Sequence, residues 1–200
     1  TAGSTEFDKV VATLQGANFT DTISGPISFT PEKTLARSNF VVLVGKGGAQ
    51  PRPFPLDGGC ALFYSARYAL FHGLAAVGLA PQDTVLVPAY CCGTELDPLL
   101  RFGLRLRFYD VDERLRPDLG SLRAKWDAGV RALLVIHYFG FDCLSDEVEA
   151  LCRARGALLL EDCAHALLSR SEHGEPLGSR GELAVFSLRK TLGIPDGGAL

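Results

Sequence analysis

The sequence predicts an α/β fold in which a mainly parallel sheet is covered by helices on both faces. Short apolar segments recur between residues 84 and 187, and segments with helical periodicity separate them. Strands that are apolar on both faces, joined by helices of about ten residues, are typical of buried parallel sheets. The 200 residues are 47% hydrophobic and 22% charged, which is the composition of an ordinary globular chain.

The predicted elements follow one another in chain order. Helices are expected at 7–14, 66–77, 95–102, 117–126 and 145–155, and strands at 23–29, 39–44, 84–87, 106–109, 131–136, 157–160 and 184–187. Ser65 stands where a side chain would cap the helix at 66–77. Pro117 fits the first turn of a helix, where its missing N–H costs nothing.

A composition change divides the chain. Residues 46–57 are rich in glycine and proline, which interrupt regular elements, and we interpret them as a linker. The linker separates a short α+β segment, 1–45, from the α/β domain of 58–200. The chain contains no methionine and stops inside an apolar pattern. We therefore expect a fragment of a longer protein, with the domain incomplete at its C-terminal end.

Charge and cysteine usage exclude several classes of protein. A net charge of -3 gives no reason to expect nucleic acid or an anionic membrane as a partner. No apolar run reaches the roughly 18 residues that span a bilayer. The six cysteines lack the spacing of metal ligands, so we expect no metal and interpret them as reduced, buried thiols of a cytoplasmic protein.

Polar and aromatic residues follow each predicted strand, where ligands bind in open α/β sheets. They are Tyr90 and Cys92 after 84–87, His137 after 131–136, Asp162 and His165 after 157–160, and Ser187 and Lys190 at the end of 184–187. Each histidine is a candidate base, stacking ring or packing residue. Neither has a second ligand at a spacing that suits a metal.

Two of these residues have both an ordinary and a functional interpretation. A carboxylate at Asp162, directly after a buried strand, is costly unless it meets a cation or several donors. It is either a turn or capping residue or the counter-ion of a protonated ring nitrogen in a cofactor. Lys190 is either a solvated surface group or an amine that condenses with a carbonyl.

The start of the helix at 66–77 is a candidate anion site. Ser65 precedes its free backbone N–H groups, and Arg67 adds a fork of donors beside Tyr68. The alternative is an ordinary capped helix that binds nothing.

The order of these features resembles that of a known family. The matching segments are SARYAL (65–70), GLAPQDTVLVPAY (78–90), FYDVD (108–112), IHYFG (136–140), LLLEDCAHAL (158–167), LGSRGELAVFSLRK (177–190) and PDGGAL (195–200). From about residue 58 onward, the chain resembles the DegT/StrS family of sugar aminotransferases. The resemblance implies the large domain of the fold-type I pyridoxal-phosphate architecture.

The resemblance implies a role for each candidate. Lys190 would form the Schiff base with pyridoxal 5'-phosphate and move the proton between Cα and the cofactor, while Asp162 would pair with the pyridinium nitrogen. The remaining cofactor-binding residues would be Ser65, Arg67 and Tyr68 at the helix start, Ser187 through its hydroxyl, His165 beside the ring, and Cys92. Relatives usually have glutamine in place of His165, and many have an aromatic ring in place of Cys92. His137 and Tyr90 are assigned to substrate binding or to structure.

The resemblance also implies an activity and partners. It implies transfer of an amino group from an amino acid to a keto group. Glutamate is the expected donor, and a nucleotide-linked sugar is the acceptor considered. Relatives continue beyond the lysine loop into a small domain and form homodimers, so this chain alone is expected to lack catalytic parts. A dehydratase is disfavoured, because dehydratases of the family replace the lysine with histidine.

Two alternatives to an enzyme stay open. The first is a relative that binds pyridoxal phosphate, or senses it, without turnover, which Cys92 and the missing C-terminal part favour. The second is a small-molecule binding module, because residues 10–33 and 39–44 resemble the C-terminal end of periplasmic branched-chain amino-acid-binding proteins.

Overall fold

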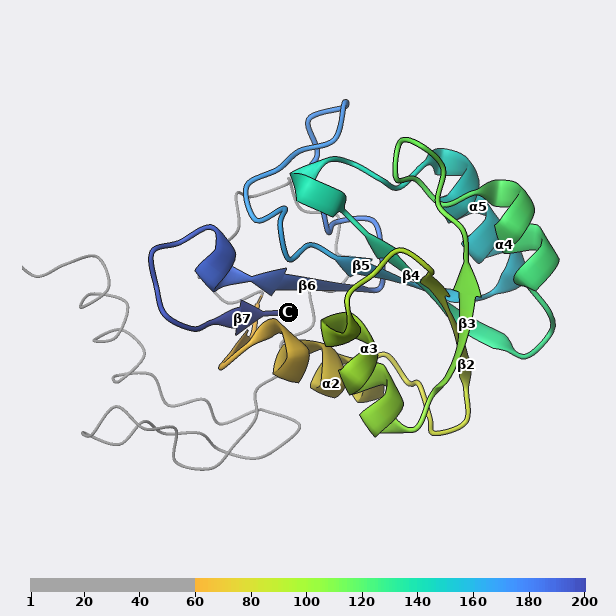
Figure 1. The fold of residues 1–200 in the computed structure, drawn as a ribbon, viewed down its shortest axis with the longest axis horizontal. Coiled ribbons are helices and arrows are strands. Elements are labelled where there is room, and N and C mark those ends of the chain that lie inside the picture. Colours follow the sequence, from red (N-terminus) through yellow and green to blue (C-terminus); the bar gives the residue numbers. More distant parts are fainter. Residues whose placement is uncertain (1–59) are drawn as a thin grey trace, which may run out of the picture.

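Residues 60–200 are described by the computed structural model, and they build a seven-stranded sheet with helices packed on both faces (Figure 1). The strands are β1 (Leu62–Phe63), β2 (Thr84–Pro88), β3 (Arg105–Tyr109), β4 (Val130–Ile136), β5 (Leu158–Asp162), β6 (Leu183–Ser187) and β7 (Gly198–Ala199). The helices are α2 (Ala66–Ala76), α3 (Gly93–Phe102), α4 (Leu119–Lys125) and α5 (Asp146–Arg155). The elements expected within 1–45, and the linker 46–57, lie outside the described residues.

The sheet confirms the predicted α/β class. Its order is β1-β7-β6-β5-β4-β2-β3, and the strands from β6 to β3 run parallel to one another. Their carboxyl ends therefore meet at one edge of the sheet. At the other side of the sheet, β7 pairs in the antiparallel sense with both β6 and β1.

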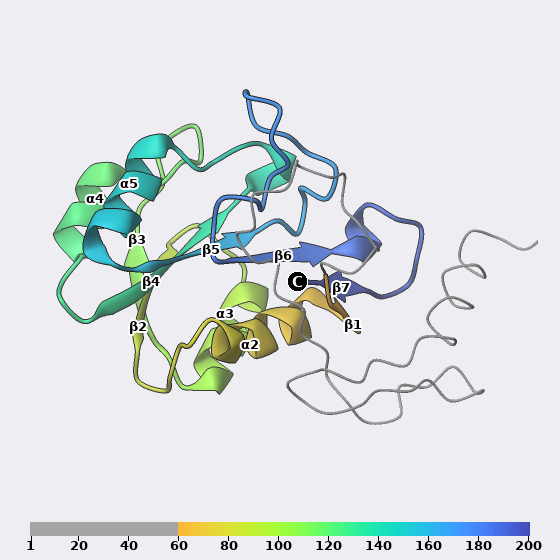
Figure 2. The same ribbon diagram turned by 180° about the vertical axis from the view of Figure 1, so that it is seen from behind.

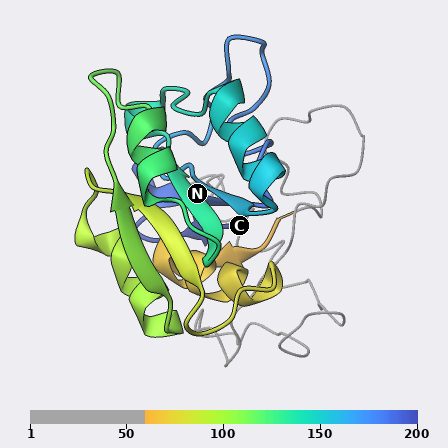
Figure 3. The same cartoon turned by 90° about the vertical axis from the view of Figure 1, so that its right-hand side faces the viewer.

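Two apolar layers hold the helices on the sheet. Helices α2 and α3 cover one face, and α4 and α5 cover the other, as the views from behind and from the side show (Figures 2 and 3). Neighbouring residues of β5 alternate between the layers: Leu159 packs with the α4 and α5 layer, and Leu160 with the α2 and α3 layer. The same alternation sends the side chains of Glu161 and Asp162 to opposite faces.

Most predicted helices and strands from residue 66 onward are found within two residues of their expected bounds, with two corrections. The helix expected to begin at Pro117 begins at Leu119, because Asp118 caps it by accepting a hydrogen bond from the Ser121 N–H at 2.6 Å. Pro117 instead pairs with Val111 in an isolated bridge. Ser65 is the residue before α2, as predicted, but its side chain makes no capping hydrogen bond.

The two-residue strands β1 and β7 were not predicted, and they position the start of α2. Gly197 donates its N–H to the Tyr64 carbonyl at 2.9 Å. A Cβ atom on Gly198 would lie 2.3 Å from both the Ala66 nitrogen and the Ser65 carbonyl carbon. Only glycine permits this approach, so the backbone of β7 packs directly against the backbone at the N-terminus of α2.

Among residues 60–200, no helix has the length and apolar character needed to cross a membrane.

We expect Gly198→Ala to lower the free energy of unfolding of the full chain by roughly 3 kcal/mol, because the added methyl group forces backbone apart. Urea unfolding measures this change. Gly93→Ala is the matched control, since a Cβ there meets nothing within 4 Å. Equal stabilities of the two variants would contradict the proposed contact.

Candidate functional site

A cavity of about 720 Å³ lies between the N-terminal ends of α2 and α3 and the carboxyl ends of β5 and β6. Seven of the residues singled out from the sequence line it, namely Ser65, Arg67, Tyr68, Cys92, Asp162, Ser187 and Lys190. They come from four separate elements and the turn after β6. The fold thus brings together residues that are up to 125 positions apart in the sequence.

Asp162 is the acidic group at the inner end of this cavity. Its side chain is 5% exposed, and Oδ1 accepts a hydrogen bond from the Ala164 N–H at 2.8 Å. Burial raises the pKa of Asp162 to about 6; the Ala164 hydrogen bond lowers it, nearby Glu95 raises it further, and the Lys190 charge lowers it. The hydrogen bond and the nearby charge therefore do not offset the cost of burying the carboxylate, and a cation placed in the cavity would stabilise its charged form.

Lys190 is exposed and ends the short 3-10 turn that follows β6. Its Nζ lies 3.0 Å from Nε2 of His165. Burial lowers the pKa of His165, and the Lys190 charge lowers it further. A neutral His165 ring can therefore accept a hydrogen bond from the lysine ammonium. The ring of Phe139 stacks on His165, with centroids 6.2 Å apart and planes 7° apart.

The start of α2 lines the same cavity and offers donors that suit an anion. The first amides of a helix have no partner within it, and the helix dipole adds positive potential there. Arg67 and the buried Ser187 hydroxyl line the same space. A phosphate group fits such a donor set.

The start of α3 contributes Glu95, which sequence reasoning missed. Cys92 is the residue before α3, and its thiol donates to Glu95 Oε2 at 2.8 Å. A Glu three residues after a capping residue is a known helix-start signal, but cysteine in place of serine or threonine obscured it. Cys92 is exposed, against the expectation of buried thiols, whereas Cys143, Cys152 and Cys163 are buried.

His137 and Tyr90 do not line the cavity. His137 is 1% exposed, and its ring is hydrogen-bonded to Glu161 at 2.9 Å on the opposite face of the sheet. The Tyr90 ring is exposed and packs on Tyr138, whose hydroxyl donates to the Tyr90 carbonyl. The geometry gives both residues structural contacts.

The cavity residues fit pyridoxal phosphate. A carboxylate in need of a cation suits the pyridinium nitrogen, an amine suits the aldehyde, and a helix start with an arginine suits the phosphate. A volume of about 720 Å³ exceeds the needs of the cofactor alone and leaves room for a substrate.

Comparison with known proteins places the chain in a family. The DegT/DnrJ/EryC1/StrS aminotransferase family matches residues 59–200. The chain belongs to this family, as the sequence resemblance predicted.

Individual relatives agree with this assignment. Protein MosB of Rhizobium meliloti is 35% identical over 142 residues, which are 67% of this chain and 27% of that protein. The dTDP-4-dehydro-2,3,6-trideoxy-D-glucose 4-aminotransferase of Saccharopolyspora spinosa is 34% identical over 137 residues, 67% of this chain and 35% of that protein. The chain thus spans well under half the length of these two relatives.

A solved structure shares the fold. The E. coli GDP-4-keto-6-deoxy-D-mannose-3-dehydratase with bound hydrated PLP superposes with a TM-score of 0.64 at 26% identity. The match covers 70% of this chain and 38% of that one.

We expect Asp162→Asn to change how stability depends on pH in the cofactor-free protein. Burial raises the pKa of Asp162 from 3.8 to about 6 in the folded protein, so folding favours the protonated carboxyl. The stability that the protonated group provides is fully present below pH 3.8 and is lost as the pH rises through 6. Asparagine cannot ionise, so the variant should gain roughly 2 kcal/mol relative to the wild type between pH 4 and pH 7. Urea unfolding at both pH values measures it, and parallel pH profiles would contradict it.

Proposed function

We propose that the protein is a pyridoxal-phosphate-dependent aminotransferase that moves an amino group from an amino acid, with glutamate as the donor, to a keto group of a nucleotide-linked sugar. The observation that carries this proposal is that Asp162, Lys190 and the N-terminus of α2 line one cavity. These are the three groups that the nitrogen, aldehyde and phosphate of one cofactor molecule require.

Each residue has a physical task in this proposal. The start of α2 with Arg67 and Ser187 binds the phosphate, and Asp162 holds a proton on the ring nitrogen by pairing with its positive charge. When bound, pyridoxal phosphate supplies an electron sink for the carbanion formed at the substrate Cα. Lys190 would hold the cofactor through its aldehyde carbon, and its free amine would accept and return the proton at the substrate Cα. His165 accepts a hydrogen bond from the lysine and so limits where the amine can point.

The acceptor and partner classes rest on the relatives. A sugar aminotransferase and a dehydratase with bound PLP are among them by name. Homodimerisation is proposed on three exposed apolar side chains, Phe139, Phe141 and Leu168, which are 66%, 71% and 74% exposed. A cytoplasmic location is proposed on the free thiols of all six cysteines.

A second candidate is cofactor binding without turnover. Cys92 favours it, because an exposed thiol at the start of α3 cannot stack on a ring as an aromatic side chain can. Measuring both cofactor binding and amine transfer in the same preparation separates the two functions.

The first test concerns Lys190. Adding pyridoxal phosphate should give a visible absorption band, and borohydride should remove the band and leave a cofactor tag on Lys190. The band should be absent in Lys190→Ala, because no other amine lines the inner end of the cavity among the described residues. Lys125→Ala removes an exposed lysine at the end of α4, which does not line the cavity, and should leave the band in place. A band of full intensity in Lys190→Ala refutes the assignment.

The second test concerns the phosphate site. Arg67→Gln should weaken the binding of pyridoxal phosphate about tenfold, the worth of one charge-assisted hydrogen bond, and leave pyridoxal without its phosphate unaffected. Fluorescence titration gives both dissociation constants. Arg123→Gln, an exposed arginine on α4 away from the cavity, serves as the control. If Arg67→Gln weakened the binding of pyridoxal phosphate and of pyridoxal equally, the phosphate would not bind at Arg67.

A further inference from the structure

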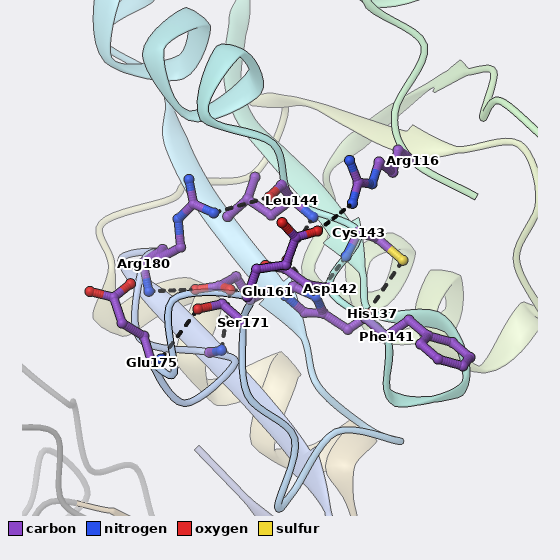
Figure 4. Close-up of polar contacts among 12 residues, drawn as sticks. Arg116, His137, Phe141, Asp142, Cys143, Leu144, Glu161, Ser171, Glu175 and Arg180 are labelled. Atoms are coloured by element: carbon purple, nitrogen blue, oxygen red, sulfur yellow. Dashed lines mark hydrogen bonds and ion pairs between the residues drawn. The ribbon is translucent and has the colours of Figure 1, made fainter. Parts of the chain in front are cut away.

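The residue that precedes Asp162 is a second buried carboxylate. Glu161 is 1% exposed and lies on the opposite face of β5 from the cavity, next to His137 (Figure 4). It has no contact with the cofactor site, and neither the fold class nor the family match explains why a charge is buried there. A buried carboxylate without compensation is strongly destabilising, so its partners define its role.

Four donors surround Glu161. His137 Nε2 lies 2.9 Å from Oε2, and the backbone N–H groups of Gly178, Arg180 and Gly181 donate to the carboxylate at 3.2, 2.9 and 2.5 Å. Burial alone would raise the pKa of Glu161. The hydrogen bonds from His137, Gly181 and Arg180 outweigh this effect and hold its pKa below the ordinary value. Glu161 is therefore ionised and fully hydrogen-bonded.

His137 joins Glu161 to Asp162. The Cys143 N–H donates to its Nδ1 at 3.3 Å, so Nδ1 is the accepting nitrogen and Nε2 carries the proton given to Glu161. The backbone N–H of His137 donates to the Asp162 carbonyl at 3.0 Å. The residue that directly follows β4 thus contacts the side chain of one acid and the main chain of the next.

The connection from β5 to β6 explains why these donors need a carboxylate. Parallel strands are usually joined by a helix that satisfies its own amides, but residues 163–182 contain turns, bends and one isolated bridge, and no helix. Glu161 accepts three of the amides near the end of this crossover. A Cβ on Gly181 would lie 2.6 Å from the Leu159 carbonyl oxygen, so the crossover also packs directly against β5.

The far side of the crossover is held by Arg180. Its guanidinium donates to Glu149 at 2.8 Å and to Asp146 at 2.6 Å, both on α5. It also donates to the Leu144 carbonyl at 3.0 Å (Figure 4). The crossover is thus fixed between α5 and the Glu161 carboxylate.

A metal ion is the other interpretation of this region. Ligand atoms of His137, Glu161 and Cys163 lie within 4.8 Å of one another. However, burial raises the pKa of the Cys163 thiol well above its ordinary value, which opposes the thiolate that a metal needs. The oxygens of Glu161 are already used by four donors. The contacts therefore favour a hydrogen-bonded anchor.

We propose that Glu161, together with His137, is a positioning residue for Asp162. Because side chains alternate along β5, fixing the Glu161 carboxylate on one face fixes the direction in which Asp162 points into the cavity on the other. Loss of the anchor removes these hydrogen bonds from one face of β5 and releases the crossover that packs against it, so the Asp162 carboxylate is no longer held opposite the ring nitrogen. This inference rests on the proposed function of Asp162.

The test measures the contact between Asp162 and the ring nitrogen. The full chain is titrated with pyridoxal phosphate and with its deaza analogue, in which the ring nitrogen is replaced by carbon. The ratio of the two dissociation constants reports that contact alone, because a general loss of stability weakens both ligands together. The wild type should prefer pyridoxal phosphate about tenfold, and Asp162→Ala should reduce the ratio to about one.

Glu161→Gln should lower the preference for pyridoxal phosphate over its deaza analogue, measured as the ratio of the two dissociation constants, at least about threefold. The Lys190-dependent absorption band should persist. Glu147→Gln, an exposed glutamate in the first turn of α5, is the matched control and should keep the wild-type ratio. A wild-type ratio in folded Glu161→Gln overturns the inference.

A second variant covers the case in which Glu161→Gln does not fold. His137→Leu keeps the backbone hydrogen bond to Asp162 and removes the side-chain donor to Glu161, so its ratio of the two dissociation constants should also fall. An unchanged ratio in His137→Leu then overturns the inference. If the wild type itself shows no preference, the proposed role of Asp162 is wrong, and the inference falls with it.

Discussion

The burial of the Asp162 carboxylate at the end of an apolar strand is the constraint on which the site depends. The preceding residues Leu159 and Leu160 are buried in the two apolar layers, so β5 cannot move outward to solvate the acid. Its pKa is raised to about 6 chiefly by this burial. The fold therefore holds a charge that is unfavourable until a cation enters the cavity, and a protonated pyridinium ring supplies one.

The neighbouring acids Asp162 and Glu161 point to opposite faces of β5 and have different surroundings. Asp162 faces the cavity and accepts a hydrogen bond from the Ala164 N–H, whereas Glu161 faces the crossover and has four donors. The first carboxylate is poised to bind a ligand, and the second is satisfied and rigid. Placing both on one strand couples the stability of the crossover to the geometry of the cofactor site.

Sequence patterns were sufficient for the parallel core and for most of the cavity. Apolar runs at 157–160 and 184–187 identified β5 and β6, and the rule that ligands bind at strand carboxyl ends brought Lys190 and Asp162 together. The short strands β1 and β7 carry no periodicity, so Gly198 beneath α2 could not be foreseen. The role of Glu161 depends on amides 17 to 20 residues later in an irregular crossover, which local patterns do not reveal.

The most direct test of the central claim is a crystal structure of the protein with pyridoxal phosphate, reduced with borohydride to fix the linkage. The account predicts a bond from Lys190 Nζ to the former aldehyde carbon, the ring nitrogen within hydrogen-bonding distance of Asp162, and the phosphate at the start of α2. A ring whose nitrogen faces away from Asp162, or a phosphate bound away from α2, would contradict it.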